Sequence, residues 1–96
     1  MLNFWPFKDS PDVVVFTSRD VIDLGEWIHH VSHDLDDGAW QFHSINGSPD
    51  DPSDARVVSL KNIVDMDHSL LEIADLPVGW IASRKAKDAS WVRTKA

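Results

Sequence analysis

Cysteine is absent from the chain. Disulfide bonds and thiolate metal sites are therefore excluded, which is typical of a protein that works in a reducing cytoplasm. No apolar segment approaches the ~20 residues that a membrane-spanning helix needs. The first twelve residues also lack the basic region and the long apolar run of a secretory signal. We therefore expect a soluble, cytoplasmic protein that makes no contact with a membrane.

The motifs of the common catalytic sites are absent as well. The sequence contains no G-x-S-x-G nucleophile motif and no glycine-rich phosphate loop. Ser32 and His33 are neighbours in a predicted strand, so their side chains point to opposite faces and cannot form a direct pair. No two carboxylates have a spacing that singles them out as acid and base. The sequence therefore predicts no catalytic residue, no cofactor and no enzymatic activity.

Positive charge is scarce, since nine Lys and Arg residues stand against sixteen Asp and Glu residues and give a net charge of −7 at pH 7. Five of the nine basic residues lie in the last thirteen positions, so the acidic excess is concentrated in the rest of the chain. An acidic body repels the phosphates of nucleic acids, which disfavours DNA and RNA as partners. A basic protein, by contrast, would be attracted to it.

The length and composition predict one small α+β domain. Ninety-six residues are enough for a single core, and five Trp and four Phe supply large apolar side chains. Residues 1–12 are predicted to form an irregular N-terminal arm, and residues 13–96 the domain. We expect a mostly antiparallel sheet of about five strands with two or three short helices on one side. The segments with strand-like composition are 13–17, read as a buried strand, 27–33, 39–44, 56–60, 79–84 and 90–94.

Three serines mark the predicted starts of short helices. Ser18 precedes RDVIDL, which Gly25 would close, and Ser59 precedes LKNIV. Ser69 and Glu72 fit the S-x-x-E capping box, in which the serine oxygen accepts from a free backbone N–H and the glutamate reaches back to the cap. Each signal predicts a short helix that packs on the sheet.

Residues 28–44, IHHVSHDLDDGAWQFHS, hold four of the chain's five histidines and are typical of a β-hairpin. If His33 lies opposite Ala39, then His29 lies opposite His43. Alternation would then turn one set of side chains toward the core, namely Ile28, His30, Trp40 and Phe42. The other set would point away from it, namely His29, Val31, His33, Gln41 and His43. The sequence therefore predicts a hairpin with a polar outer side.

The outward histidines of this hairpin are the candidates for a metal site. His29 and His43 would lie close enough to bridge one ion, which makes them weak candidates. His33 lies four residues from His29, about 13 Å away at ~3.3 Å per residue. This distance is too long for both side chains to bind the same zinc ion. The DLDDG segment resembles a calcium loop superficially, but Gly38 comes one residue too early for that motif. We therefore expect no metal, and read the aspartates as turn formers.

Three separated blocks of the sequence carry a resemblance. They follow the patterns V-S-H-D-x-D-D-G-x-W-Q-F at 31–42, A-x-x-V-S-L at 55–60 and D-x-S-L-x-x-x-A-D-L-P-x-G-W at 67–80. In these blocks the chain resembles a family of small bacterial domains of unknown function, some relatives of which are described as immunity proteins of polymorphic-toxin systems. The resemblance implies a small domain that binds and inhibits a toxin, and it implies no catalytic residues.

The expected function is a non-enzymatic protein-binding module, with a basic protein such as a toxin as its partner. The residues expected to contact the partner are Asp34, Asp36, Asp37, His33 and His43. One alternative is a metal- or small-ligand-dependent activity on the His-bearing side of the hairpin. Another is a housekeeping domain that forms a homodimer through an open sheet edge. The sequence leaves both a monomer and a homodimer open.

Overall fold

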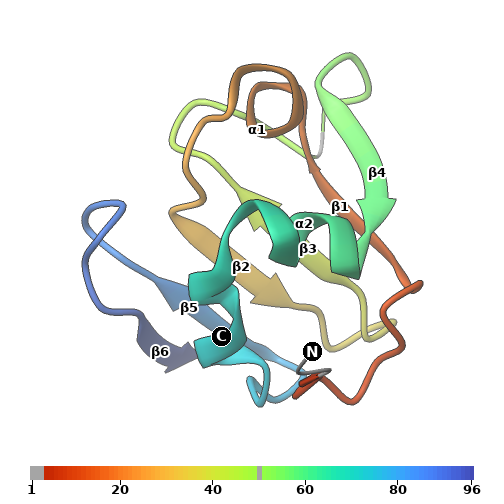
Figure 1. The fold of residues 1–96 in the computed structure, drawn as a ribbon, viewed down its shortest axis with the longest axis vertical. Coiled ribbons are helices and arrows are strands. Elements are labelled where there is room, and N and C mark those ends of the chain that lie inside the picture. Colours follow the sequence, from red (N-terminus) through yellow and green to blue (C-terminus); the bar gives the residue numbers. More distant parts are fainter. Residues whose placement is uncertain (1–3, 50) are drawn as a thin grey trace.

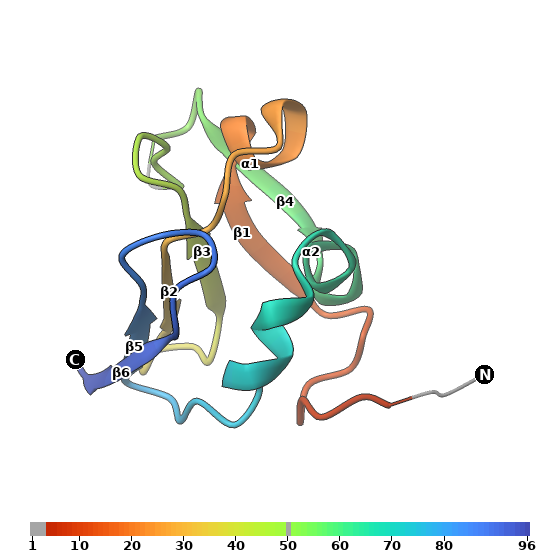
Figure 2. The ribbon, with the colours of Figure 1, turned by 60° about the vertical axis from the view of Figure 1, so that its left-hand side comes forward.

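The computed structural model describes residues 4–49 and 51–96, which form a six-stranded sheet with three short helices on one of its sides (Figures 1 and 2). Along the chain the elements are β1 (Val14–Ser18), α1 (Arg19–Leu24), β2 (His30–His33), β3 (Trp40–His43), β4 (Ala55–Ser59), α2 (Leu60–Met66), the 3-10 helix η1 (His68–Ile73), β5 (Trp80–Ser83) and β6 (Val92–Lys95). The predicted α+β class is confirmed, with six strands in place of about five. Of the predicted N-terminal arm, residues 4–12 contain no helix or strand, and residues 1–3 lie outside the described part.

The sheet has the strand order β4-β1-β3-β2-β5-β6. β1 and β3 are parallel, whereas the other four neighbouring pairs are antiparallel. The expectation of a mostly antiparallel sheet is therefore confirmed. The β2–β3 hairpin occupies the centre of the sheet, so the histidine-rich segment lies far from both edges.

The predicted helix starts after Ser18 and Ser59 are confirmed, and the predicted start at Ser69 is wrong. Gly25, with φ 69°, closes α1 as expected, although the Ser18 hydroxyl donates to the Asp20 carboxylate and makes no capping bond to the backbone. Ser59 caps α2 by accepting from the backbone N–H of Asn62 at 3.1 Å. The capping box at Ser69 does not form, because the Asp67 side chain accepts from the Ser69 backbone N–H and starts η1 earlier.

The core lies between the helices and one face of the sheet. Its largest fully buried side chains come from both layers: Val15, Val31 and Phe42 from the strands, and Leu60, Ile63, Leu70 and Ile73 from α2 and η1. Phe7 of the arm is also buried and meets Trp40 edge to face at 5.5 Å. The arm is therefore partly anchored on the body, although Phe4 is exposed.

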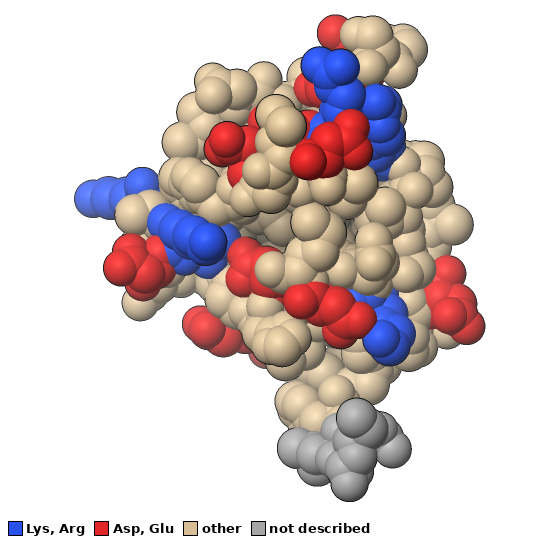
Figure 3. Space-filling model, turned by 45° about the horizontal axis from the view of Figure 1, so that its top comes forward, with Lys and Arg blue, Asp and Glu red and all other residues tan. Residues whose placement is uncertain are grey.

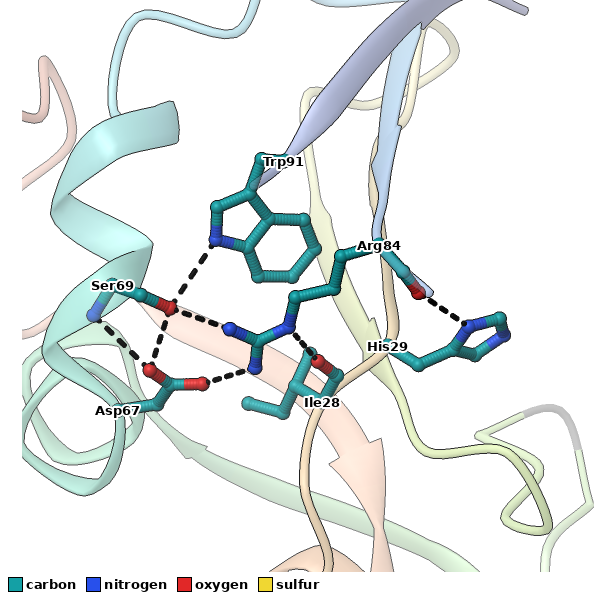
Figure 4. A network of polar contacts seen from close by, with 6 residues as sticks. All are labelled: Ile28, His29, Asp67, Ser69, Arg84 and Trp91. Atoms are coloured by element: carbon teal, nitrogen blue, oxygen red, sulfur yellow. Dashed lines mark hydrogen bonds and ion pairs between the residues drawn. The ribbon is translucent and has the colours of Figure 1, made fainter. Parts of the chain in front are cut away.

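The buried side chain of Arg84, which follows β5, forms hydrogen bonds with residues at the start of η1 (Figure 4). Arg84 is 4% exposed; its Nε donates to the Ile28 carbonyl at 2.8 Å, its Nη1 to Ser69 Oγ at 2.9 Å, and its Nη2 to Asp67 Oδ2 at 2.7 Å. The guanidinium also lies over the Trp91 ring, 4.3 Å from its centroid. Each of the three guanidinium nitrogens thus donates a hydrogen bond inside the fold, as a buried charge requires. Arg84 is therefore a structural residue, although it is one of the five basic residues in the last thirteen positions.

Candidate functional site

The hairpin at the centre of the sheet has a register one residue away from the predicted one. His33 pairs with Trp40, Val31 with Phe42, and His30 with His43. The turn decides this, because the Asp34 backbone N–H donates to the Ala39 carbonyl at 2.8 Å and closes a loop that starts after His33. A one-residue slip exchanges the faces of the strand.

The observed register places three side chains of β2 on the side opposite to the predicted one. Val31, expected to point outward, is fully buried, while His30, expected in the core, lies on the outer side next to His43. His33 now shares the core side with Trp40 and stacks on its ring, with centroids 3.9 Å apart. The predictions that Trp40 and Phe42 are buried and that Gln41 and His43 point away from the core are confirmed.

The side of the sheet that carries no helix presents two rows of uncharged residues. Directly paired residues share a face, so the strand pairings define a first row that crosses all six strands and a second row that runs from β3 to β6. The first row is Val57, Phe16, Gln41, Ser32, Ile81 and Thr94, and the second contains His43, His30, Ser83 and Val92. We call these ten residues the outer face. None of them is Asp, Glu, Lys or Arg, in a chain in which 26% of residues are charged.

The outer face is apolar toward both edges and polar at its centre. Val57 is 59% exposed at the β4 edge and Val92 is 61% exposed at the β6 edge, while Phe16 and Ile81 are half-buried between them. The sequence interpretation of 13–17 as a buried strand is correct only for alternate positions, since Val14 is 53% exposed. The helix side differs, because acidic and basic side chains are scattered together over it (Figure 3).

Two histidine rings stand side by side at the centre of the outer face. The centroids of His30 and His43 are 5.3 Å apart, and the His29 ring lies 6.0 Å from that of His30. Burial lowers the pKa of His30 below its ordinary 6.5, and the neighbouring His29 lowers it further. His30 is therefore neutral at pH 7, and this position adds no charge to the face.

The structure does not bring these histidines together with further ligands. The register pairs His43 with His30 and not with His29, whose Nδ1 lies 3.5 Å from the Arg84 carbonyl oxygen. Over residues 4–49 and 51–96, no group of three or more His, Cys, Asp or Glu side chains is placed to hold a metal ion. The weak metal candidates of the sequence analysis therefore do not form the pair that was expected of them.

The acidic turn between β2 and β3 borders the outer face. Asp37 Oδ1 accepts from the Ala39 backbone N–H at 2.9 Å, so this aspartate shapes the turn as expected. Asp34 Oδ2 accepts from Nε2 of Gln41, an outer-face residue, at 2.7 Å. Asp36 is exposed at the tip.

The five residues expected to bind a partner do not share one surface. Asp34 contacts the outer-face residue Gln41, Asp36 and Asp37 lie in the same turn, and His43 belongs to the outer face. His33, by contrast, lies on the helix side against Trp40. The sequence did not reveal the apolar members of the outer face, which are Phe16, Val57, Ile81 and Val92. Their alternation with buried neighbours was visible, but their alignment across six strands depends on a strand order that the sequence does not display.

No protein-family model, curated protein or solved structure matches this chain. Within the described residues no helix has both the length and the apolar character needed to cross a membrane.

Proposed function

We propose that this protein is a non-enzymatic protein-binding module and that its partner docks on the outer face. The observation that carries the proposal is the lack of any charged side chain among the ten residues of that face. A solvated sheet face ordinarily alternates buried apolar residues with outward polar and charged ones. Depletion of charge at the centre, together with an aromatic residue such as Phe16, is instead characteristic of the core of a protein–protein interface.

The charge around this surface supports a basic partner. The acidic turn with Asp34, Asp36 and Asp37 borders the outer face, and the whole chain has a net charge of −7. A neutral centre beside an acidic rim would let a basic protein approach by electrostatic attraction and then bury apolar surface. The most specific form of the proposal is an immunity protein that covers a basic toxin in the bacterial cytoplasm, in line with the resemblance of blocks 31–42, 55–60 and 67–80. The absence of cysteine supports that compartment.

A matched pair of lysine substitutions tests the proposal. Val57→Lys puts a charge on the outer face and Leu24→Lys puts the same charge on α1; both positions are exposed, so neither variant should unfold. Each protein is used to capture partners from a bacterial extract, and the captured protein is then titrated as a purified component. We expect Val57→Lys to weaken binding by about 10-fold or more and Leu24→Lys to leave it unchanged. Equal affinity for the two variants would show that the outer face is not the docking surface.

A second copy of the chain is the alternative occupant. Sedimentation of the purified wild-type protein distinguishes it: a dimer that Val57→Lys dissociates would mean that the face mediates self-association.

A further inference from the structure

A hollow of about 400 Å³ lies on the helix side, between the N-terminal arm and the segment that leads from η1 to β5. This size falls within the ~300–1,000 Å³ typical of small-molecule sites. Its wall is mainly apolar and is formed by Pro6, Trp40, Ala74, Leu76, Pro77 and Val78. Four polar residues complete it: Lys8, Asp9, His33 and Asp75.

His33 presents a hydrogen-bond acceptor at this hollow. Its Nδ1 lies 2.7 Å from the Leu76 carbonyl oxygen. A carbonyl oxygen can only accept, so Nδ1 carries the proton, and in the neutral ring Nε2 is an acceptor. Nε2 forms no hydrogen bond with residues 4–49 and 51–96. Every buried side-chain nitrogen or oxygen in those residues has a hydrogen-bond partner, so Nε2 is not a buried atom. Nε2 is therefore accessible, on a ring that is held in place by stacking on Trp40.

Asp9 supplies a fixed negative charge at the same hollow. Its Oδ2 accepts from Trp40 Nε1 at 2.8 Å, and its backbone carbonyl accepts from Trp5 Nε1 at 2.7 Å. These two bonds position the carboxylate against the wall that Trp40 forms. The other acidic residue, Asp75, is already engaged, because Arg93 Nη2 donates to its Oδ1 at 2.6 Å.

We propose that this hollow binds a small organic cation, namely an amine carried on a compact apolar or aromatic body. The Asp9 carboxylate and His33 Nε2 both accept hydrogen bonds, which suits a ligand that donates several and carries a positive charge. The apolar wall takes the body of the ligand and removes it from water. An anionic ligand of the same shape would place its charge against Asp9, which the bond from Trp40 Nε1 holds in place. The other charge at the hollow, the Lys8 ammonium, belongs to an exposed residue with a flexible stem, so it can turn away from a bound cation. The site lies on the helix side and does not depend on the outer face or on its partner.

Two matched probes test the ligand chemistry. Phenethylamine and 2-phenylethanol share an aromatic ring and a two-carbon chain, but only the first is a cation at pH 7. Each is titrated into the isotopically labelled protein while the NMR signals of the Trp40 indole N–H and the His33 ring are followed. We expect the amine to shift both signals and to bind about tenfold more tightly than the alcohol, the effect of one charge-assisted contact. Equal affinities, or no shift at Trp40 and His33, would overturn the proposal.

Two substitutions locate the site. Asp9→Asn removes the charge while its amide oxygen can still accept from Trp40 Nε1, so it should weaken amine binding about tenfold and leave the alcohol unaffected. Asp12→Asn is the matched control, because Asp12 is an exposed arm residue that does not line the hollow. Val78→Phe, at a wall position 47% exposed, should block both probes by filling space without unfolding the protein. The same affinity in Asp9→Asn as in Asp12→Asn, or full binding in Val78→Phe, would contradict the assignment.

Discussion

Arg84 and Asp67 form an ion pair with 2.7 Å between Nη2 and Oδ2, and the arginine side chain is 1% exposed. The two residues join the end of β5 to the start of η1, so the pair fixes the helix layer against the sheet (Figure 4). The same guanidinium bonds the Ile28 carbonyl just before β2. The Arg84 guanidinium thus connects three parts of the chain, and the Asp67 carboxylate supplies the negative charge that a buried arginine needs.

Removal of the Asp67 carboxylate should destabilise the fold far more than removal of the exposed Asp65 carboxylate. Asp67→Ala leaves a buried guanidinium without its counter-charge, which costs about 3–5 kcal/mol of unfolding free energy. Asp65→Ala is the control, because Asp65 pairs with Lys61 at the surface, where such pairs contribute about 0–1 kcal/mol. Urea unfolding of the two variants measures both values. A loss at Asp67 no larger than the loss at Asp65 would mean that the pair does not anchor η1.

The observed register of the β2–β3 hairpin buries Val31 and places its neighbour His30 on the outer face, so substitutions at the two positions should differ in cost. Val31 is fully buried, so Val31→Thr places a hydroxyl in the core and should cost about 1–3 kcal/mol. His30→Gln replaces one polar outer-face side chain by another and should change the unfolding free energy by about 0.5 kcal/mol or less at pH 7. Thermal or urea unfolding compares the two. A larger cost at His30 than at Val31 would restore the register in which His29 faces His43.

Acidification should destabilise the protein through His30. The folded state holds the pKa of this ring below 6.5, because burial and the adjacent His29 disfavour its charge. Below pH 6.5 the unfolded chain therefore binds the proton more readily than the folded chain. The stability that depends on the neutral ring is complete above pH 6.5 and is lost as the pH falls from there toward the folded pKa.

The matched variants for this pH effect are His30→Gln and His68→Gln. His68 is exposed on η1, so its replacement should leave the pH dependence of the wild type in place. His30→Gln should lose less stability than the wild type between about pH 7 and about pH 5, measured as unfolding free energy in urea. An identical pH profile for His30→Gln and His68→Gln would exclude His30 as the group responsible.

The sequence was sufficient for features that depend on neighbours along the chain. The strands of the two hairpins, the closure of α1 by Gly25 and the cap of α2 by Ser59 all follow from local patterns, and all are present. The acidic turn was also recognised, and Asp37 shapes it.

Features that depend on distant residues were not accessible in the same way. The sequence showed Arg84 only as the end of a predicted strand and as one of five basic residues in the last thirteen positions, because its partners Ile28 and Asp67 lie 56 and 17 positions away. The hairpin register was missed by one residue because the bond between Asp34 and Ala39 decides it, and either turn length suits the same residue types. The uncharged outer face needs the order of all six strands, so no single strand reveals it.

A map of the bound surface tests the central claim most directly. NMR signals of the protein are followed while the purified partner is added, and perturbations are compared between the two sides of the sheet. The account predicts shifts at Val57, Phe16 and Ile81 of the outer face, and unchanged signals at Leu24 and Met66, which are exposed on α1 and α2. Perturbation of Leu24 and Met66 with an unchanged outer face would contradict it.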